Sequence, residues 1–198
     1  MKIAAAILAG GKASRLGGVA KGLLPDDGGV PVIRRLMDEL AAAGITEVIV
    51  AANDAAAYAI FEKPIVADIH PGIGPLGGIE AALGHLASRC DAVVLLPCDL
   101  PNITACEILK LVHDHQAVPD RVVLAGSPEG RHPLCAVVPV GVLPRVVEAI
   151  TAGQYEVGRL WRSLGARVVQ IDDSRRLVNI NTPEDLQQWR RSPNRTRE

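Results

Sequence analysis

The stretch IAAAILAGGKASRLGGVAKG, from Ile3 to Gly22, decides how the rest of the chain is interpreted. Its first part, Ile3–Leu8, is a continuous aliphatic run, which is typical of a strand buried on both faces of a parallel sheet. Its second part mixes glycines with the cations Lys12, Arg15 and Lys21. Glycine permits positive φ and a close backbone approach, so that successive amide N–H groups can surround an anion. The stretch therefore predicts a phosphate-binding loop, although similar compositions also form ordinary solvated turns.

The loop is not a Walker motif, because no Gly-Lys pair in it has the required upstream glycine and a following Ser or Thr. The wider composition fits one α/β domain over residues 1–190, followed by a flexible basic tail over residues 191–198. The hydrophobic content of 48% excludes a disordered chain. The aromatic content of 3% argues against a base-stacking platform, and the net charge of −1 indicates neither a nucleic-acid nor a membrane partner.

No apolar run reaches the roughly 20 residues that span a bilayer. The N-terminal run ends in the glycine loop rather than in a cleavage site, which favours a first strand over a signal segment. The cysteines show neither a C-x-x-C pair nor zinc spacing, and aliphatic residues flank them, as they often flank buried thiols. We therefore expect reduced thiols and a cytoplasmic protein. The cysteines are Cys90, Cys98, Cys106 and Cys135.

Short aliphatic runs alternate with helix-length amphipathic segments along the whole chain. The expected strands are 3–8, 48–51, 65–67, 92–96, 121–124, 135–138 and 167–171. This alternation predicts an α/β fold in which helices cover both faces of a mostly parallel sheet. Helix starts are indicated by Pro75, by Thr104 with Glu107, and by Thr182-Pro183 with Asp185. The segment GSPEG (126–130) is the clearest exposed loop.

In such sheets, ligands bind beyond the carboxyl ends of the strands. Asp99 in LLPCDLPN follows a buried strand and would lie near the cationic loop. A carboxylate in this position suits Mg²⁺, which one or two carboxylates hold together with substrate phosphates and water. The alternative is an Asp that only caps a turn. The neighbouring Cys98 is interpreted as an inert buried thiol.

The stretch ADIHPGIGPLGGIEAAL contains G-x-G-x-x-G at Gly72, Gly74 and Gly77. Because Asp99 follows after about 20 residues, a dinucleotide-dependent oxidoreductase is one alternative. Against it, that fingerprint normally lies in the first strand-to-helix turn, and a more cationic loop occupies that turn here. A tight turn before a proline-started helix, with Asp68 as a turn acceptor, is a further alternative.

Near the C-terminus, the segment VNINTPEDL contains Asn179 and Asn181 two positions apart. In an extended segment these side chains project to the same side, where they could contact a polar ligand or complete a metal shell. An asparagine-rich turn before a capped helix is the simpler alternative.

Four blocks together resemble the molybdenum cofactor guanylyltransferase family. LAGGKASRLGGVAK resembles its signature loop, GPLGGI its G-P-L-A-G-[IM], PCDLP its P-C-D-x-P and NINTPEDL its N-x-N-T-P-E-[DE]-L. They occur in the family's order across nearly the whole chain. The resemblance implies a three-layer α/β/α Rossmann-like nucleotidyltransferase fold. It also implies an enzyme that joins GMP from GTP to the terminal phosphate of molybdopterin, with Mg²⁺ as cofactor and pyrophosphate as leaving group.

By matching position, the resemblance implies a role for each site residue. Those that bind GTP are Leu8, Ala9, Gly10, Gly11 and Lys21, with Asn53 and Asp68 at the guanine or ribose. Asp99 would hold Mg²⁺ and meet GTP, Asn179 and Asn181 would face the pterin, and Arg15 and Lys21 would stabilise the leaving pyrophosphate. The implied partners are GTP, molybdopterin, and transiently the proteins that supply the cofactor or mature molybdoenzymes.

The chain departs from the family pattern in a few places. Ala20 stands where an acidic residue is common, Leu16 where Met is usual, and Gly77 where alanine is usual. The pair Gly10-Gly11 favours guanylyl transfer, because the cytidylyl relatives usually read L-A-A-G. Other open alternatives are a transferase that uses CTP or a sugar phosphate, and a non-catalytic GTP-binding module.

Overall fold

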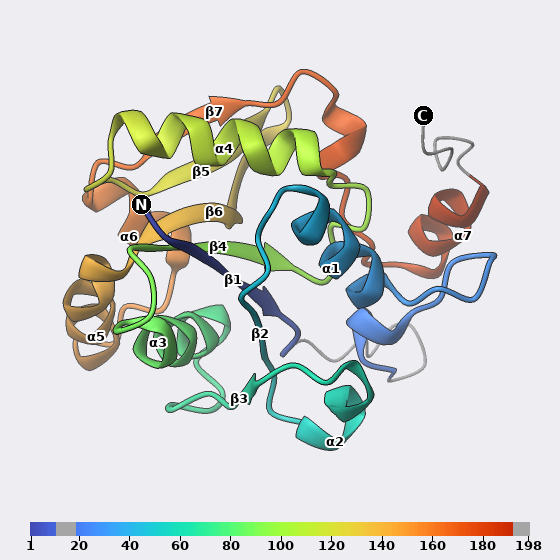
Figure 1. The fold of residues 1–198 in the computed structure, drawn as a ribbon, viewed down its shortest axis with the longest axis horizontal. Coiled ribbons are helices and arrows are strands. Elements are labelled where there is room, and N and C mark those ends of the chain that lie inside the picture. The colour runs from blue at the N-terminus through green and yellow to red at the C-terminus, as the bar shows by residue number, and fades with distance from the viewer. Residues whose placement is uncertain (11–18, 192–198) are drawn as a thin grey trace.

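A seven-stranded sheet crosses the molecule, and helices cover both of its faces (Figure 1). The computed structural model describes residues 1–10 and 19–191. The strands of this sheet lie in the order β3-β2-β1-β4-β6-β5-β7. They are β1 (Ile3–Leu8), β2 (Val48–Ala51), β3 (Ile65–Val66), β4 (Ala92–Pro97), β5 (Val123–Ser127), β6 (Gly130–Pro139) and β7 (Arg167–Gln170).

The sheet is parallel except at β6. Strand β1 pairs in parallel with both β2 and β4, and β5 pairs in parallel with β7. Strand β6 lies antiparallel between β4 and β5. The expectation of a mostly parallel α/β sheet is confirmed.

Two groups of helices enclose the sheet. On one face, α1 (Val32–Ala42) and α4 (Ala105–Ala117) share a buried cluster with Trp189 of α7 (Pro183–Arg191). On the other face, α3 (Pro75–Leu86), α5 (Leu143–Thr151) and α6 (Val157–Ser163) form a second cluster. The short α2 (Ala55–Tyr58) lies beside the β3 edge (Figure 1). The 3-10 turns are η2 (Lys21–Leu23), η3 (Ala59–Phe61), η4 (Val140–Val142) and η5 (Ser174–Leu177).

The central strands contribute side chains to both faces. Along β1, Ala5 and Ile7 join the cluster under α1 and α4, whereas Ala4 and Ala6 join the cluster under α3. All four are fully buried. Because side chains alternate across a strand, only an uninterrupted apolar run can be buried on both faces, as the sequence predicted.

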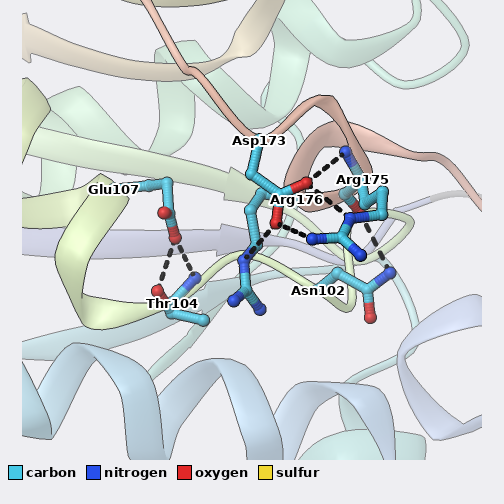
Figure 2. Close-up of polar contacts among 6 residues, drawn as sticks. All are labelled: Asn102, Thr104, Glu107, Asp173, Arg175 and Arg176. Atoms are coloured by element: carbon cyan, nitrogen blue, oxygen red, sulfur yellow. Dashed lines mark hydrogen bonds and ion pairs between the residues drawn. The ribbon is translucent and has the colours of Figure 1, made fainter. Parts of the chain in front are cut away.

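The predicted helix starts are confirmed. Thr104 and Glu107 form a capping box, in which the backbone N–H of Thr104 donates to Glu107 Oε2 at 3.0 Å (Figure 2). At α7, Thr182 N donates to Asp185 Oδ2 at 2.8 Å, and Asp185 N donates to Thr182 Oγ1 at 3.1 Å. Helix α3 begins at Pro75.

Several sequence-based details were wrong. The segment GSPEG is not a wholly exposed loop, because Gly126 and Ser127 are buried in β5. Strand β6 begins at Gly130, so the exposed part of the segment is only the tip of a β5–β6 hairpin. Cys106 is exposed on α4, although the other three cysteines are buried. Arg190 lies in the last turn of α7, and its Nε donates to the carbonyl of Pro25 at 3.1 Å. Residues 192–198 of the predicted basic tail lie outside the described residues. Within the described ranges, no helix is long and apolar enough to cross a membrane.

Candidate active site

A cavity of about 540 Å³ opens beyond the carboxyl ends of β1, β2 and β4. This is the edge of a parallel sheet where α/β proteins bind ligands. The predicted binding residues that line it are Leu8, Ala9, Gly10, Lys21, Asn53, Asp68 and Asp99. Segments far apart in the sequence therefore meet around one cavity. The predicted residues Gly11 and Arg15 lie outside the described residues.

The residues on either side of the 11–18 segment are fixed by close packing. Ala9 N donates to the carbonyl of Ala51 at 2.8 Å, and the Tyr58 hydroxyl contacts the carbonyl of Ala9 at 3.3 Å. Burial raises the pKa of Tyr58, so its hydroxyl remains a neutral donor. Gly22 approaches Cys98 so closely that a Cβ at Gly22 would lie 2.9 Å from the sulfur.

Lys21 connects two of the other predicted site segments. Its Nζ donates to Asn181 Oδ1 at 2.5 Å and lies 3.4 Å from Asp99 Oδ2. The Lys21 and Asp99 side chains are only 19% and 23% exposed. Partial burial reduces screening by water, so these charges act on a ligand more strongly than surface charges would.

The loop after β4 and the asparagine segment are joined directly. Ile180 N donates to the Asp99 carbonyl at 2.8 Å. Asn102 Nδ2 donates to the Arg175 carbonyl at 3.2 Å (Figure 2). Arg175 Nε in turn donates to Asp173 Oδ1 at 2.7 Å. The hydrogen bonds from Arg175 lower the pKa of the Asp173 carboxyl. These contacts hold the 173–181 segment beside Asp99.

The two asparagines have different surroundings. Both are exposed, whereas Ile180 between them is 2% exposed, which is the alternation of an extended segment. Asn181 reaches the site through Lys21. The Asn179 side chain makes no hydrogen bond within residues 1–10 and 19–191, and neither asparagine is among the residues that line the cavity.

Asn53 and Asp68 orient each other at the β2–β3 side of the cavity. Asn53 Nδ2 donates to Asp68 Oδ2 at 2.9 Å, and Asp68 N donates to Asn53 Oδ1 at 2.9 Å. Both residues line the cavity, so one carboxylate and one carboxamide are presented to a ligand as a fixed pair.

The glycine turn before α3 lines the same cavity, although no individual residue of this turn was assigned a role from the sequence. Gly72, Gly74 and Gly78 all contribute to its wall, and Gly74 has φ of +79°. The GPLGGI block was the sequence signal for this turn. Leu134 of β6 also lines the cavity, but no local pattern indicated it, because β6 reaches the site only through antiparallel pairing with β4.

The metal prediction depends on Asp99 alone among the side chains described. No group of three or more His, Cys, Asp or Glu residues that could hold a metal is present within residues 1–10 and 19–191. Asp99 Oδ2 faces Lys21, and Oδ1 accepts no hydrogen bond from the described residues. A single accessible carboxylate beside a cavity fits the way Mg²⁺ binds when substrate phosphates supply further ligands.

Together, these features define a class of protein. A glycine-rich sequence after the first strand, a Lys-Asp pair and a cavity at the sheet edge are typical of α/β proteins that bind nucleotides. Residues 5–169 match the model of the MobA-like NTP transferase domain, so the chain belongs to this family of nucleotidyltransferases. Membership in a transferase family argues against the oxidoreductase alternative.

Relatives are similar over nearly the whole chain. The probable molybdenum cofactor guanylyltransferase of Rhodopirellula baltica is 33% identical, with 91% of this chain and 88% of the relative covered. The molybdenum cofactor guanylyltransferase of Pseudomonas fluorescens is 34% identical, with 91% and 90% covered. The crystal structure of molybdopterin-guanine dinucleotide biosynthesis protein A from Archaeoglobus fulgidus has a TM-score of 0.77 at 21% identity, with 95% and 96% covered. This last likeness confirms the Rossmann-like fold.

Proposed function

We propose that this protein transfers GMP from GTP to the terminal phosphate of molybdopterin, releases pyrophosphate and requires Mg²⁺. The observation that carries the proposal is the contact of Lys21 with both Asp99 and Asn181 at the cavity. These residues come from three of the four blocks that resemble the family. The names of the curated relatives support the same activity.

The reaction needs positioning and charge stabilisation more than it needs a protein nucleophile. An oxygen of the molybdopterin phosphate attacks the α-phosphorus of GTP in line. The bond from that phosphorus to the bridging oxygen breaks, and the electron pair leaves with pyrophosphate. Lys21, together with Arg15, would stabilise the growing negative charge. Cys98 is unsuited to attack, because burial raises the pKa of its thiol.

Each remaining residue has a binding role in this proposal. Leu8, Ala9 and Gly10 would bring backbone groups close to the GTP phosphates. The Asn53–Asp68 pair would contact the guanine or ribose. Asn179 and Asn181 would face the pterin substrate. Asp99 would hold Mg²⁺, and the ion would supply neutralisation of phosphate charge.

Ala20 stands where the resembling family commonly has an acidic residue, and this difference affects the surroundings of Lys21. Ala20 is half-buried and packs against the cluster beneath α1, so it presents no charge beside Lys21. We therefore keep CTP and sugar phosphates as alternative substrates, to be distinguished by experiment.

A cytoplasmic location and transient contacts with cofactor-supplying or molybdoenzyme-maturation proteins belong to the same proposal.

A substrate panel tests the proposal. Binding of GTP, CTP and NAD⁺, each with Mg²⁺, is measured by isothermal titration, and pyrophosphate release is then followed with molybdopterin or a sugar phosphate as acceptor. The proposal predicts the tightest binding for GTP and release of pyrophosphate with molybdopterin. Tighter binding of CTP or NAD⁺ would contradict it. Binding of GTP without turnover would indicate a non-catalytic module.

A further inference from the structure

The segment between Asp68 and Gly74 forms one wall of the cavity. Asp68 lies at one end, where Asn53 holds it, and Gly74 lies at the other, directly before α3. Gly72 and Gly74 both have positive φ, at +86° and +79°. Within the described residues, no backbone hydrogen bond joins residues 69–73 to the rest of the protein. The backbone alone therefore does little to fix this wall.

A side-chain contact fixes the middle of the segment. The His70 imidazole and the Glu80 carboxylate of α3 lie 2.8 Å apart, between Nδ1 and Oε2. A carboxylate oxygen accepts, so Nδ1 is the donor in this hydrogen bond. The Glu80 side chain is 5% exposed, whereas that of His70 is 50% exposed. A buried carboxylate is costly without a partner, so the pairing favours the conformation in which His70 lies against α3.

The backbone of the segment also approaches α3 very closely. A Cβ at Gly77 would lie 2.9 Å from the His70 carbonyl oxygen and 3.3 Å from both Cβ and Cγ of Asp68. A contact of 2.9 Å with a backbone atom cannot be accommodated without movement. The glycine at this position, where the resembling family usually has alanine, therefore allows the segment and Asp68 to lie nearer to α3.

We propose that His70 and Glu80 are positioning residues, whose hydrogen bond holds residues 68–74 against α3 and so preorganises the nucleoside side of the cavity. This inference rests on the proposed function, because it takes the cavity to be the GTP site. Without the bond, the segment would populate other conformations, and the apparent affinity would fall in proportion to the lost population. A binding-competent fraction of about one tenth gives roughly tenfold weaker GTP binding.

The test compares His70→Ala with the double variant His70→Ala/Glu80→Leu. The single variant leaves a buried carboxylate unpaired, which lowers thermal stability. The double variant removes that carboxylate and recovers much of the stability. It still lacks the His70–Glu80 hydrogen bond, which we call the tether. We expect roughly tenfold weaker GTP binding in both, with KM for GTP raised by a similar factor and kcat within about twofold. Because His70 is half exposed, the single variant suffices if the double variant does not fold.

Two further variants serve as controls. Glu80→Gln keeps an oxygen that accepts from His70, so this variant should retain a GTP affinity within about twofold of that of the natural chain. His85→Ala removes an exposed histidine from the same helix, outside the cavity wall, and should leave GTP binding unchanged. If GTP affinity recovers together with stability in the double variant, the role of the pair is only structural and the inference is overturned.

Amide hydrogen exchange without nucleotide separates this inference from the proposed function. Faster exchange at residues 69–73 in His70→Ala is the expected result. If the natural chain fails to bind GTP while this exchange increases, the proposed function fails and the tether itself stands. If the natural chain binds GTP while exchange and affinity are both unchanged in His70→Ala, the tether is overturned and the proposed function stands.

Discussion

Lys21 Nζ donates to Asn181 Oδ1 at 2.5 Å across a sequence separation of 160 residues. The residue after the glycine loop is thereby joined to the segment that precedes the last helix. Asp99 lies beside the same ammonium group, at 3.4 Å. One cation thus connects the phosphate, metal and acceptor parts of the proposed site, and a change at any of the three affects the others.

Replacing Lys21 tests the charge at this junction. Lys21→Met keeps much of the aliphatic chain and removes the ammonium, so pyrophosphate release with molybdopterin should fall by about 10²–10³-fold, as when one preorganised transition-state donor is lost. Steady-state assays with GTP provide the measurement. Lys110→Met is the matched control, because Lys110 lies on α4, pairs with the exposed Asp172 and is outside the cavity wall. Equal losses in the two variants would contradict the assignment.

Replacing Asp99 tests the metal prediction. Asp99→Asn retains size but removes the negative charge that Mg²⁺ requires, so turnover should fall steeply and demand a higher Mg²⁺ concentration. A titration of activity against Mg²⁺ measures both effects. Asp172→Asn, whose side chain is 93% exposed, should titrate like the natural chain. An unchanged Mg²⁺ dependence in Asp99→Asn would remove Asp99 from the metal site.

Gly77 and Gly84 lie on the same helix but in different surroundings. Gly77→Ala should displace the 68–74 segment and weaken GTP binding about tenfold, because its Cβ would meet the His70 carbonyl. Gly84→Ala meets nothing within 4 Å and should stabilise the protein by about 0.8–1 kcal/mol through helix propensity. Calorimetric titration with GTP and thermal unfolding measure the pair. Full GTP affinity in Gly77→Ala would show that the close approach does not matter for binding.

A buried histidine on α4 should make stability depend on pH. His115 is fully buried, its Nδ1 donates to the Arg121 carbonyl at 3.0 Å, and its Nε2 has no partner within the described residues. Burial lowers the pKa of His115 in the folded state. At a pH between the His115 pKa values of the folded and unfolded states, the unfolded chain binds more protons than the folded protein does. The free energy of unfolding therefore decreases as the pH falls below about 6.5.

The measurement is the free energy of unfolding from pH 8 to pH 5. His115→Gln should flatten the curve on its acid side, where one proton contributes up to about 1.4 kcal/mol per pH unit. His113→Gln, on the exposed side of the same helix, should leave the slope unchanged. An equally steep curve in His115→Gln would assign the pH dependence to other groups.

Much of the fold was predictable because it rests on local patterns. The uninterrupted apolar runs at 3–8 and 92–96 are typical of strands buried on both faces, and both strands are central in the sheet. The capping box at Thr104 and the Pro75 helix start are likewise short-range features. The antiparallel course of β6 was not predictable, because pairing partners far apart in sequence leave no local signal.

For the candidate site, the sequence by itself determined which residue types follow which strands: glycine and cations after β1, an aspartate after β4, and paired asparagines before α7. Their assembly was decided by the tertiary structure, since only the sheet order places the ends of β1 and β4 side by side and brings Asn181 to Lys21. The His70–Glu80 contact and the need for glycine at position 77 also appeared only in three dimensions. The distance between two packed segments depends on the combined packing of all the side chains between them, and no local sequence pattern encodes that packing.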